Sequence, residues 1–277
     1  MIGGAKNSME HMRDGKKHAK WGGLFRRKPT NQHYDFGWGF AWRWGFLIGG
    51  ILFLALSIGI FITNKSLYIL SGLLFLVALQ LFMGDLALRY IHKIDAELIL
   101  PYVNWLTSDE DLVLDAGCGS GRTSIAVSKI LKNGKIIAVD KFDAPYIGDG
   151  GKRLLEQNLK VAYIQDKVDI QTHDITNLTF ENDVFDAAVS TYVLDHMGKD
   201  DQLKGLKEVN RVLKKDGKFL MMIMLPNFFT IMIFNVISVL KLTSHKEWNQ
   251  FIKEANFKCI DDGDINGGHY FLLEKDA

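Results

Sequence analysis

Two long apolar runs near the N-terminus dominate the hydrophobic pattern of the chain. Residues 44–62 (WGFLIGGILFLALSIGIFI) contain no charged residue, and after a polar turn at 63–66, residues 67–83 (LYILSGLLFLVALQLFM) again contain none. At 1.5 Å per residue, a helix over the first run spans about 28 Å, close to a bilayer hydrocarbon core of about 30 Å. A soluble helix pair would have a polar face, which both runs lack. We therefore predict a two-helix transmembrane hairpin over residues 44–84.

The segments that flank these runs predict the orientation of the hairpin. Residues 1–43 are interpreted as a flexible basic tail that ends in an aromatic stretch for the membrane interface. Arg89 and Lys93 follow the hairpin, whereas its turn offers only Lys65. Because basic residues are retained on the cytoplasmic side, we expect a multi-pass membrane protein whose N-terminus and remaining chain are cytosolic. The aromatic stretch consists of Phe36, Trp38, Phe40, Trp42 and Trp44.

Beyond residue 106, short apolar runs alternate with helical patterns. This alternation is typical of βαβ units and a parallel sheet, so the predicted fold class is α/β, with one domain over residues 107–277. The predicted strands are 112–115, 135–140, 168–173, 185–191, 218–225, 257–261 and 269–274. The predicted helices are 122–131, 151–165, 199–213 and 245–255.

Two more segments have helical character. In residues 85–106, apolar side chains recur at every fourth position from Leu86 to Leu98, which predicts a linking helix. Residues 227–242 (NFFTIMIFNVISVLKL) have a broad apolar face, but they are too few to span a bilayer comfortably. They are either an interfacial helix in the membrane surface or a core helix of the α/β domain, and the sequence leaves both interpretations open.

Composition excludes several classes of protein. With 48% hydrophobic and 23% charged residues, the 277-residue chain is not intrinsically disordered. Its two cysteines, Cys118 and Cys259, are too few for a disulfide framework or a four-thiolate zinc site. The histidines of the tail lack metal-site spacing, and His269 falls in a predicted strand, so we expect no metal site. The net charge of +1 says little by itself, and we expect no nucleic-acid partner.

The clearest chemical motif is LVLDAGCGSGR at residues 112–122, an apolar strand that runs into a glycine-rich turn and then a helix. Glycines allow a positive φ and a close approach of a ligand to the backbone, while the helix N-terminus offers free N–H groups. A nucleotide-like ligand is implied. Position 122 is Arg122 instead of the third glycine of a dinucleotide-binding loop, so the spacing is G-x-G-x-G, with Asp115 two residues before the first glycine.

This motif resembles the first motif of class I S-adenosylmethionine-dependent methyltransferases. Residues 173–197 (HDITNLTFENDVFDAAVSTYVLDHM) are similar to the corresponding stretch of ubiquinone and menaquinone biosynthesis methyltransferases. Residues 211–218 (RVLKKDGK) are similar to the segment that leads into the family's fifth strand. The resemblance covers about residues 105–275. It implies a Rossmann-like domain with a seven-stranded, mostly parallel sheet and S-adenosylmethionine as the cofactor.

The resemblance also implies a set of cofactor-binding residues. The glycine-rich loop would pack against the methionine part of the cofactor, and Asp140 would accept hydrogen bonds from the ribose hydroxyls. Asp174 would contact the adenine amino group, with Ile175 supplying a backbone amide. The complete implied set is Asp115, Ala116, Gly117, Cys118, Gly119, Gly121, Asp140, Lys141, Asp174, Ile175 and Thr191.

Candidate catalytic residues follow the fourth predicted strand. Methyl transfer from a sulfonium is an in-line displacement, so alignment supplies much of the acceleration without a covalent catalyst. Where the acceptor must lose a proton, His196 or Asp195 is the candidate base, since open α/β sheets bind ligands at this edge. A helix-capping or surface role is the alternative for each. Tyr192 is a candidate for the donor pocket. Many relatives carry two histidines where this chain has Asp195 and His196, so the role of the first histidine is not transferred.

Together these features predict a membrane-anchored methyltransferase that acts at the cytosolic face on a small, lipophilic acceptor, with the lipid bilayer as a further partner. Two alternatives remain at this stage. One is methylation of a membrane protein that docks on the hairpin, and the other is a module that binds S-adenosylmethionine without catalysis. The family methylates carbon, nitrogen, oxygen and sulfur, so the acceptor atom stays open, as does the oligomeric state.

Overall fold

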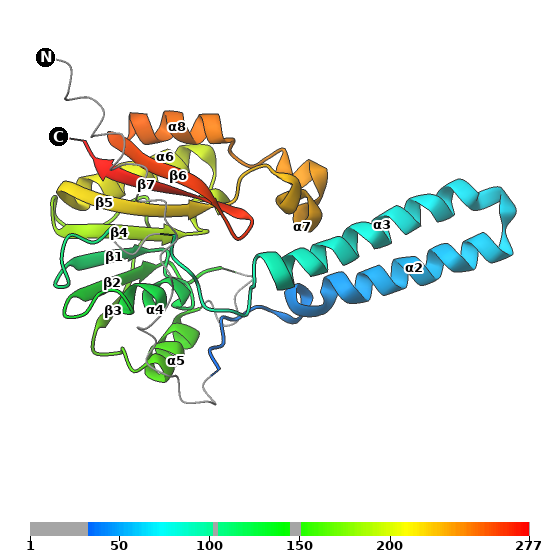
Figure 1. Cartoon of the computed structure of the whole chain (residues 1–277), viewed down its shortest axis with the longest axis horizontal. Coiled ribbons are helices and arrows are strands. Elements are labelled where there is room, and N and C mark those ends of the chain that lie inside the picture. The colour runs from blue at the N-terminus through cyan, green and yellow to red at the C-terminus, as the bar shows by residue number, and fades with distance from the viewer. Residues whose placement is uncertain (1–32, 102–104, 145–150, 277) are drawn as a thin grey trace, which may run out of the picture. The chain divides into compact units, whose positions relative to one another are not determined.

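The computed structural model describes residues 33–101, 105–144 and 151–276, so the predicted basic tail at residues 1–32 lies outside the described residues. From Tyr34 onward the chain forms one compact unit. This unit contains a long helical hairpin and an α/β domain (Figure 1).

The α/β domain is built on a seven-stranded sheet in the order β3-β2-β1-β4-β5-β7-β6. Strands β1 to β5 are parallel, and β7 runs antiparallel to both β5 and β6. The predicted Rossmann-like, mostly parallel sheet is therefore confirmed. The strands are β1 (Leu112–Ala116), β2 (Lys135–Asp140), β3 (Val168–Thr172), β4 (Phe185–Thr191), β5 (Leu213–Ile223), β6 (Phe257–Ile265) and β7 (Gly268–Lys275).

Helices pack on both faces of this sheet. Along β1 the side chains alternate, so that Leu114 joins a core with Leu206 of α6 and Trp248 of α8, while Val113 joins the opposite core with Leu155 of α5. This alternation buries both faces, which explains why the central strands are mostly apolar. The helices of the domain are α4 (Arg122–Ser128), α5 (Lys152–Ala162), α6 (Lys199–Val212), α7 (Phe228–Val239) and α8 (His245–Glu254).

The boundary between α6 and β5 differs from the sequence prediction. The strand begins at Leu213, before the predicted residue 218, because Leu213 already pairs with Phe185 of β4. The register then shifts, and Ala187 pairs with Lys218. Asp216 adopts a positive φ of 60° inside this irregular stretch. A bulge of this kind leaves no periodic hydrophobic signal, so the sequence pattern does not reveal it.

The hairpin consists of α2 (Phe46–Thr63) and α3 (Tyr68–Leu86), joined by the 3₁₀ turn η2 (Lys65–Leu67). The π-helical turns η1 (Ala41–Gly45) and η3 (Ala87–Ile91) extend the two helices toward the domain. By length and apolar composition, both extended helices are able to cross a bilayer.

Small residues hold the two helices of the hairpin together. Ser57 Oγ donates to the carbonyl of Ser71 at 2.9 Å, and Ser71 Oγ donates to the carbonyl of Ser57 at the same distance. Gly50 lies against the ring of Phe82, so close that an added Cβ would be 2.8 Å from Cε1. Small residues and reciprocal hydroxyl bonds are typical of helices that associate within lipid, where apolar burial gives no driving force.

The predicted linking helix over residues 85–106 is wrong beyond Ile91, where the helical turns end. Lys93 adopts a left-handed φ of 48°, which an α-helix does not tolerate. The guanidinium of Arg122, at the start of α4, then donates to the carbonyls of Lys93 and Ala96, at 2.9 Å each. These carbonyls therefore bind the domain instead of continuing a helix.

The aromatic stretch before the hairpin also departs from the expected interface belt. Phe36 is buried, and its ring lies under the guanidinium of Arg122. Trp38 Nε1 donates to the carbonyl of Ile94 at 2.9 Å. Phe40 and Trp44 are exposed, as an interfacial position requires. Several of these aromatic side chains are therefore occupied by contacts within the protein.

Replacement of Gly50 by leucine tests the packing of the hairpin. In G50L the new side chain overlaps the Phe82 ring, so we expect the free energy of unfolding in a mild detergent to fall by about 1–3 kcal/mol. Thermal unfolding followed by helical circular dichroism measures the change. Gly59 lies on the same helix with nothing within 4 Å of an added Cβ, so G59L is the matched control. Equal midpoints for both variants would contradict this packing.

Candidate active site

The parallel register brings the predicted site residues to one edge of the sheet. In the ladder of β1 and β2, Ala116 pairs with Val139, one residue before Asp140. Strand β1 also pairs in parallel with β4, which ends at Thr191. Ligands of open α/β sheets bind at the carboxyl ends of such strands. The segments that carry the predicted cofactor set therefore converge although they are far apart in sequence.

The turn after β1 is shaped by glycine backbone geometry. Gly117 and Gly121 have positive φ values of 82° and 88°. A Cβ on Gly117 would lie 2.4 Å from the Val193 side chain, and a Cβ on Gly121 would lie 2.4 Å from Cδ1 of Leu155. Both positions exclude any side chain, because neighbouring side chains fill the space and the backbone has a positive φ, so the turn requires glycine there.

Asp140 anchors this turn to the end of β2. Its Oδ2 accepts the N–H of Gly119 at 2.9 Å, and its Oδ1 accepts the N–H of Phe142 at 2.8 Å. Each carboxylate oxygen accepts more than one hydrogen bond, so capacity remains for two donors of a ligand. The carboxylate is therefore suited to the ribose hydroxyls that the resemblance assigns to it.

Asp115, in contrast, lies fully buried beneath the turn. Ser124 Oγ donates to its Oδ2 at 2.5 Å, while Oδ1 has no hydrogen-bond partner among the residues that the structure describes. Burial raises the pKa of Asp115 to about 7, a hydrogen bond from Ser124 opposes this shift, and the charge of Asp140 adds to it. This carboxyl group supports the turn from below.

Asp174, after β3, is held on both oxygens. Its Oδ2 pairs with Lys141 Nζ at 2.8 Å, and its Oδ1 accepts the N–H and the hydroxyl of Thr176 at 2.9 and 2.8 Å. Burial opposes ionisation of Asp174, but the hydrogen bonds from Lys141 and Thr176 outweigh it and keep its pKa below the usual value. Ile175, the next predicted residue, buries its side chain in the sheet core.

Tyr192 stands at the end of β4 with a left-handed φ of 56°. Its N–H donates to the carbonyl of Met222 at 2.7 Å, and its phenol lies against Gly268 at the start of β7. Burial raises the pKa of Tyr192 to about 12, the nearby Asp195 adds to the shift, and Arg122 opposes it. The phenol is therefore protonated at neutral pH.

Asp195 and His196 lie on the 3₁₀ turn η5 (Leu194–His196) that follows β4. Asp195 is buried, and its Oδ2 accepts the N–H of Met224 at 3.2 Å. Its Oδ1 has no hydrogen-bond partner within the described part of the chain. Burial raises the pKa of Asp195, and the neighbouring His196 partly offsets the shift. His196 is exposed.

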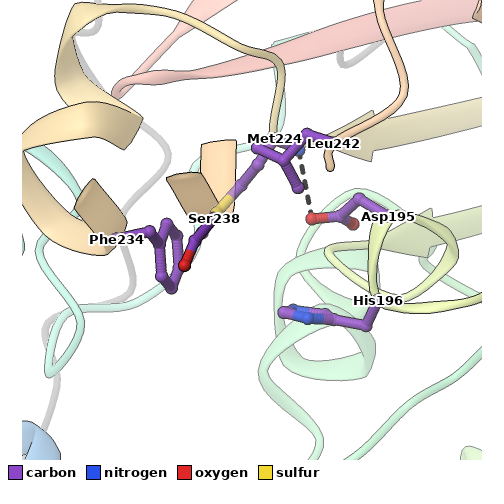
Figure 2. Close-up of a pocket in the computed structure, with 6 residues that line it drawn as sticks. All are labelled: Asp195, His196, Met224, Phe234, Ser238 and Leu242. Carbon is purple, nitrogen blue, oxygen red and sulfur yellow. Dashed lines mark hydrogen bonds between the residues drawn. The ribbon is translucent and has the colours of Figure 1, made fainter. Parts of the chain in front are cut away.

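A pocket of about 180 Å³ opens beside these two residues. Figure 2 shows Asp195 and His196 on one side of it and Phe234 and Ser238 of α7 on the other. The lining residues are Asp195, His196, Met224, Phe234, Ser238 and Leu242. The predicted catalytic pair is thus part of a pocket, whereas Tyr192 is not among the lining residues.

Two contributions to this region have no signal in the sequence. Phe234 and Ser238 belong to α7, and the hydrophobic pattern of this segment does not distinguish a membrane-surface helix from a core helix. The short segment at Asp35 is bound to the domain because its N–H donates to Asn158 Oδ1 at 3.0 Å. Asn158 Nδ2 also donates to the carbonyl of Ser120 at 2.9 Å, and Ser120 Oγ donates to the carbonyl of Phe36. These contacts join residues 38 to 123 positions apart, so spacing along the chain does not predict them.

Comparison with known proteins identifies the domain. Residues 113–217 match the family model described as a methyltransferase domain. An uncharacterized methyltransferase, YcgJ of Bacillus subtilis, is 33% identical over 116 residues, 40% of this chain and 40% of that protein. A probable methyltransferase, ltbC of Aspergillus luteorubrus, is 27% identical over 124 residues, 44% of this chain and 42% of that protein. The matched stretch spans less than half the length of these curated relatives.

Solved structures agree on the fold. An S-adenosylmethionine-dependent methyltransferase from Methanosarcina mazei superposes with a TM-score of 0.50 at 19% identity, covering 65% of this chain and 99% of that one. At this identity the likeness concerns the fold. Together with the family match, it confirms the resemblance that the sequence motifs carry.

The buried carboxyl of Asp115 predicts a pH dependence of stability. Because its folded pKa of about 7 exceeds the ordinary value of 3.8, the folded state holds a proton that the unfolded chain has released between these pH values. The free energy of unfolding therefore falls as pH rises from about 4 to about 7, by roughly 3 kcal/mol from this group. In urea unfolding, we expect the free energy of D115N to lose this dependence on pH. D143N, which changes an exposed carboxylate, is expected to keep it. Parallel curves for wild type and D115N would contradict the assignment.

Proposed function

We propose that this class I S-adenosylmethionine-dependent methyltransferase domain, whose cofactor is S-adenosylmethionine, is anchored to a membrane by its hairpin and methylates a small, lipophilic acceptor. The observation that carries the proposal is the position of α7. This helix packs against the hairpin and also supplies one wall of the pocket beside Asp195 and His196.

The large apolar surface of the hairpin supports membrane anchoring. Side chains of both helices that would be buried in a soluble protein are exposed, among them Leu52, Phe61, Ile69 and Leu76. Soluble monomers rarely expose contiguous apolar patches of more than a few hundred Å². Lipid contact gives these side chains an apolar environment, while the polar Ser57 and Ser71 bind each other between the helices.

The charges at the two ends of the hairpin support a cytosolic catalytic domain. Arg43 and Arg89 lie at the end next to the domain, and Arg89 pairs with Asp85 at 2.9 Å. Arg43 lies within 3.6 Å of Asp35 and 3.4 Å of Asp95. The distant turn carries only Lys65. By the positive-inside rule, the domain end of the hairpin faces the cytosol.

Helix α7 contacts the hairpin close to this end. Gln80 of α3 donates from Nε2 to the carbonyls of Ile231 and Met232, at 2.6 and 2.9 Å. Gly84, one turn further along α3, leaves room for the Met232 carbonyl, which an added Cβ would approach to 2.7 Å. The buried Ile233 of α7 joins a cluster with residues of η3 and the following turn, separate from both sheet cores. These contacts favour a position outside the two sheet cores, and we infer that α7 lies at the membrane surface.

The same helix forms part of the pocket. Phe234 packs edge to face on Trp42, just before the hairpin, at 6.0 Å between ring centroids, and it also lines the pocket. Exposed Phe228 and Phe229 continue the apolar surface at the start of α7. A lipophilic molecule that leaves the bilayer at this helix would meet an apolar wall before it reaches the polar side of the pocket.

On the polar side, the chain positions groups suited to an acceptor. Bound S-adenosylmethionine supplies a methyl group on a sulfonium, which makes a good leaving group. The pKa of Asp195 is raised by burial, so this carboxylate is a stronger proton acceptor than an exposed aspartate. The exposed His196 offers a second proton acceptor in the same pocket. We propose that one of them takes the acceptor's proton, while alignment in the closed pocket provides most of the acceleration.

The role of Asp140 is testable by cofactor binding. In D140N one acceptor oxygen becomes a donor, which loses a hydrogen bond to a ribose hydroxyl and the one from Gly119, so we expect the Kd for S-adenosylmethionine to rise at least about tenfold. Calorimetric titration of the full chain in detergent measures it. D143N, three residues away, is the matched control and keeps the wild-type Kd. An unchanged Kd in D140N would remove Asp140 from the cofactor site.

The acceptor class is tested with labelled S-adenosylmethionine and native membranes. We expect label in the organic phase after lipid extraction, and a KM for the extracted acceptor that is about tenfold higher in F234A, because the pocket loses its apolar wall. F229A, on the same helix but outside the pocket, keeps the wild-type KM.

Each other outcome has a defined meaning. Label that stays with protein after lipid extraction would favour methylation of a membrane protein. Label transferred only to water-soluble metabolites would refute the lipophilic acceptor and leave the reaction class intact. Cofactor binding without any transfer would favour a non-catalytic module.

A further inference from the structure

We propose that His245, Asp262 and His269 form a binding site for a divalent transition-metal ion such as Zn²⁺. The three residues come from different elements, since His245 begins α8, Asp262 lies on β6 and His269 lies on β7. Their ligand atoms all lie within 4.8 Å of one another. The sequence did not predict this group, because the spacing of the three residues matches no metal motif.

The distances between the ligand atoms suit a small cation. Asp262 Oδ2 lies 3.0 Å from His245 Nε2 and 3.2 Å from His269 Nε2. In tetrahedral zinc sites the bonds measure about 2.0–2.1 Å, which places the ligand atoms about 3.3 Å apart. The two distances from Asp262 are close to this value, and the third pair lies within 4.8 Å, so the two imidazoles would approach each other around the ion. Two imidazoles and one carboxylate are a ligand set that Zn²⁺ accepts, with the fourth position left to water.

Asp264 orients the ring of His269. Its Oδ1 lies 2.8 Å from His269 Nδ1, which leaves Nε2 directed toward Asp262. A carboxylate that accepts from the far nitrogen of a ligating histidine is the usual arrangement around protein-bound metals. At His245, the Asn249 Nδ2 donor lies 3.1 Å from Nδ1, so this amide would turn away from the Nδ1 proton when Nε2 binds an ion.

Carboxylate oxygens face both ring nitrogens of His269, those of Asp262 and Asp264. The imidazole itself is buried, with 8% of its side-chain surface exposed. Two carboxylates at one buried imidazole create a negative potential that favours a bound cation. A metal ion between Nε2 and Asp262 would lie in this potential.

The surrounding structure holds the ligands in place. His269 pairs with Ile223 of β5 and with Asp264 of β6, so its backbone is fixed on both sides. The His245 ring stacks on Phe271 at 5.4 Å and meets the His269 ring edge to face at 5.0 Å. Such preorganisation reduces the entropy that metal binding costs.

The position of the site suggests what the ion does. It would connect the N-terminus of α8 to the outer hairpin β6–β7, at the level of Ile223, where β5 ends. Met224, the next residue, lines the candidate acceptor pocket. We therefore assign the metal a structural role, as a connection that fixes the sheet edge beside the pocket. This inference does not depend on methyl transfer.

The experiment is calorimetric titration of Zn²⁺ into the metal-stripped full chain in detergent. All proteins carry asparagine in place of His11, His18 and His33, so that binding to tail histidines does not imitate the site. We expect one equivalent of Zn²⁺ and a higher midpoint of thermal unfolding. H245N, at an exposed position that tolerates replacement, is expected to weaken binding at least 100-fold. D264N, which removes an orienting group, is expected to weaken it about 10–100-fold.

H173N, which removes a histidine outside the group, is the control and should bind Zn²⁺ as the parent does. Circular dichroism of each variant checks that it is folded. Absence of Zn²⁺ binding by the folded parent would overturn the proposal. Retention of parental affinity in folded H245N and D264N would equally overturn it, because the ion would then bind elsewhere.

Discussion

The parallel pairing of β1 between β2 and β4 is the constraint on which the candidate site depends. This pairing fixes the end of β1 level with the end of β2, so the glycine-rich turn and Asp140 meet. The same strand order places η5 next to the turn, and Val193 fills the space that a side chain on Gly117 would need. A change of register by one residue would turn the core faces outward and separate these groups. The site is therefore a consequence of sheet geometry as much as of its individual residues.

A second constraint arises from polar groups in apolar surroundings. Gln80 lies near the end of an apolar helix, where an unsatisfied amide is costly. Its hydrogen bonds to two carbonyls of α7 meet that requirement and connect the hairpin to the segment after β5. One amide thereby links the proposed membrane anchor with the proposed acceptor pocket. The same rule explains why Ser57 and Ser71 face each other inside the hairpin.

Buried ionisable groups lie close to the edge of the sheet where the carboxyl ends of β1, β2 and β4 meet. Asp115 supports the turn from below, and Asp195 lies under the pocket, each with one carboxylate oxygen that has no hydrogen-bond partner in the described ranges. Burial raises the pKa of both. Perturbed carboxyls of this kind cost stability and are concentrated at functional sites. Their presence fits a region in which stability has been given up for ligand binding or proton transfer.

The sequence alone determined the sheet and located the glycine-rich turn and Asp140 at the ends of its strands. All seven predicted strands exist, because local alternation of apolar runs with helical patterns reports burial directly. The loop residues and Asp140 were identifiable because the motif is contiguous or ends a strand. The apolar runs predicted two hairpin helices for the same local reason.

Only the tertiary structure decided the remaining features. The linker after Ile91 is not helical because Arg122, distant in sequence, binds its carbonyls. The position of α7 depends on Gln80, more than 150 residues earlier. The grouping of His245, Asp262 and His269 arises from an antiparallel hairpin packed on a helix start. In each case the interaction joins residues whose separation follows no period, so a pattern along the chain carries no information about it, whereas packing in three dimensions does.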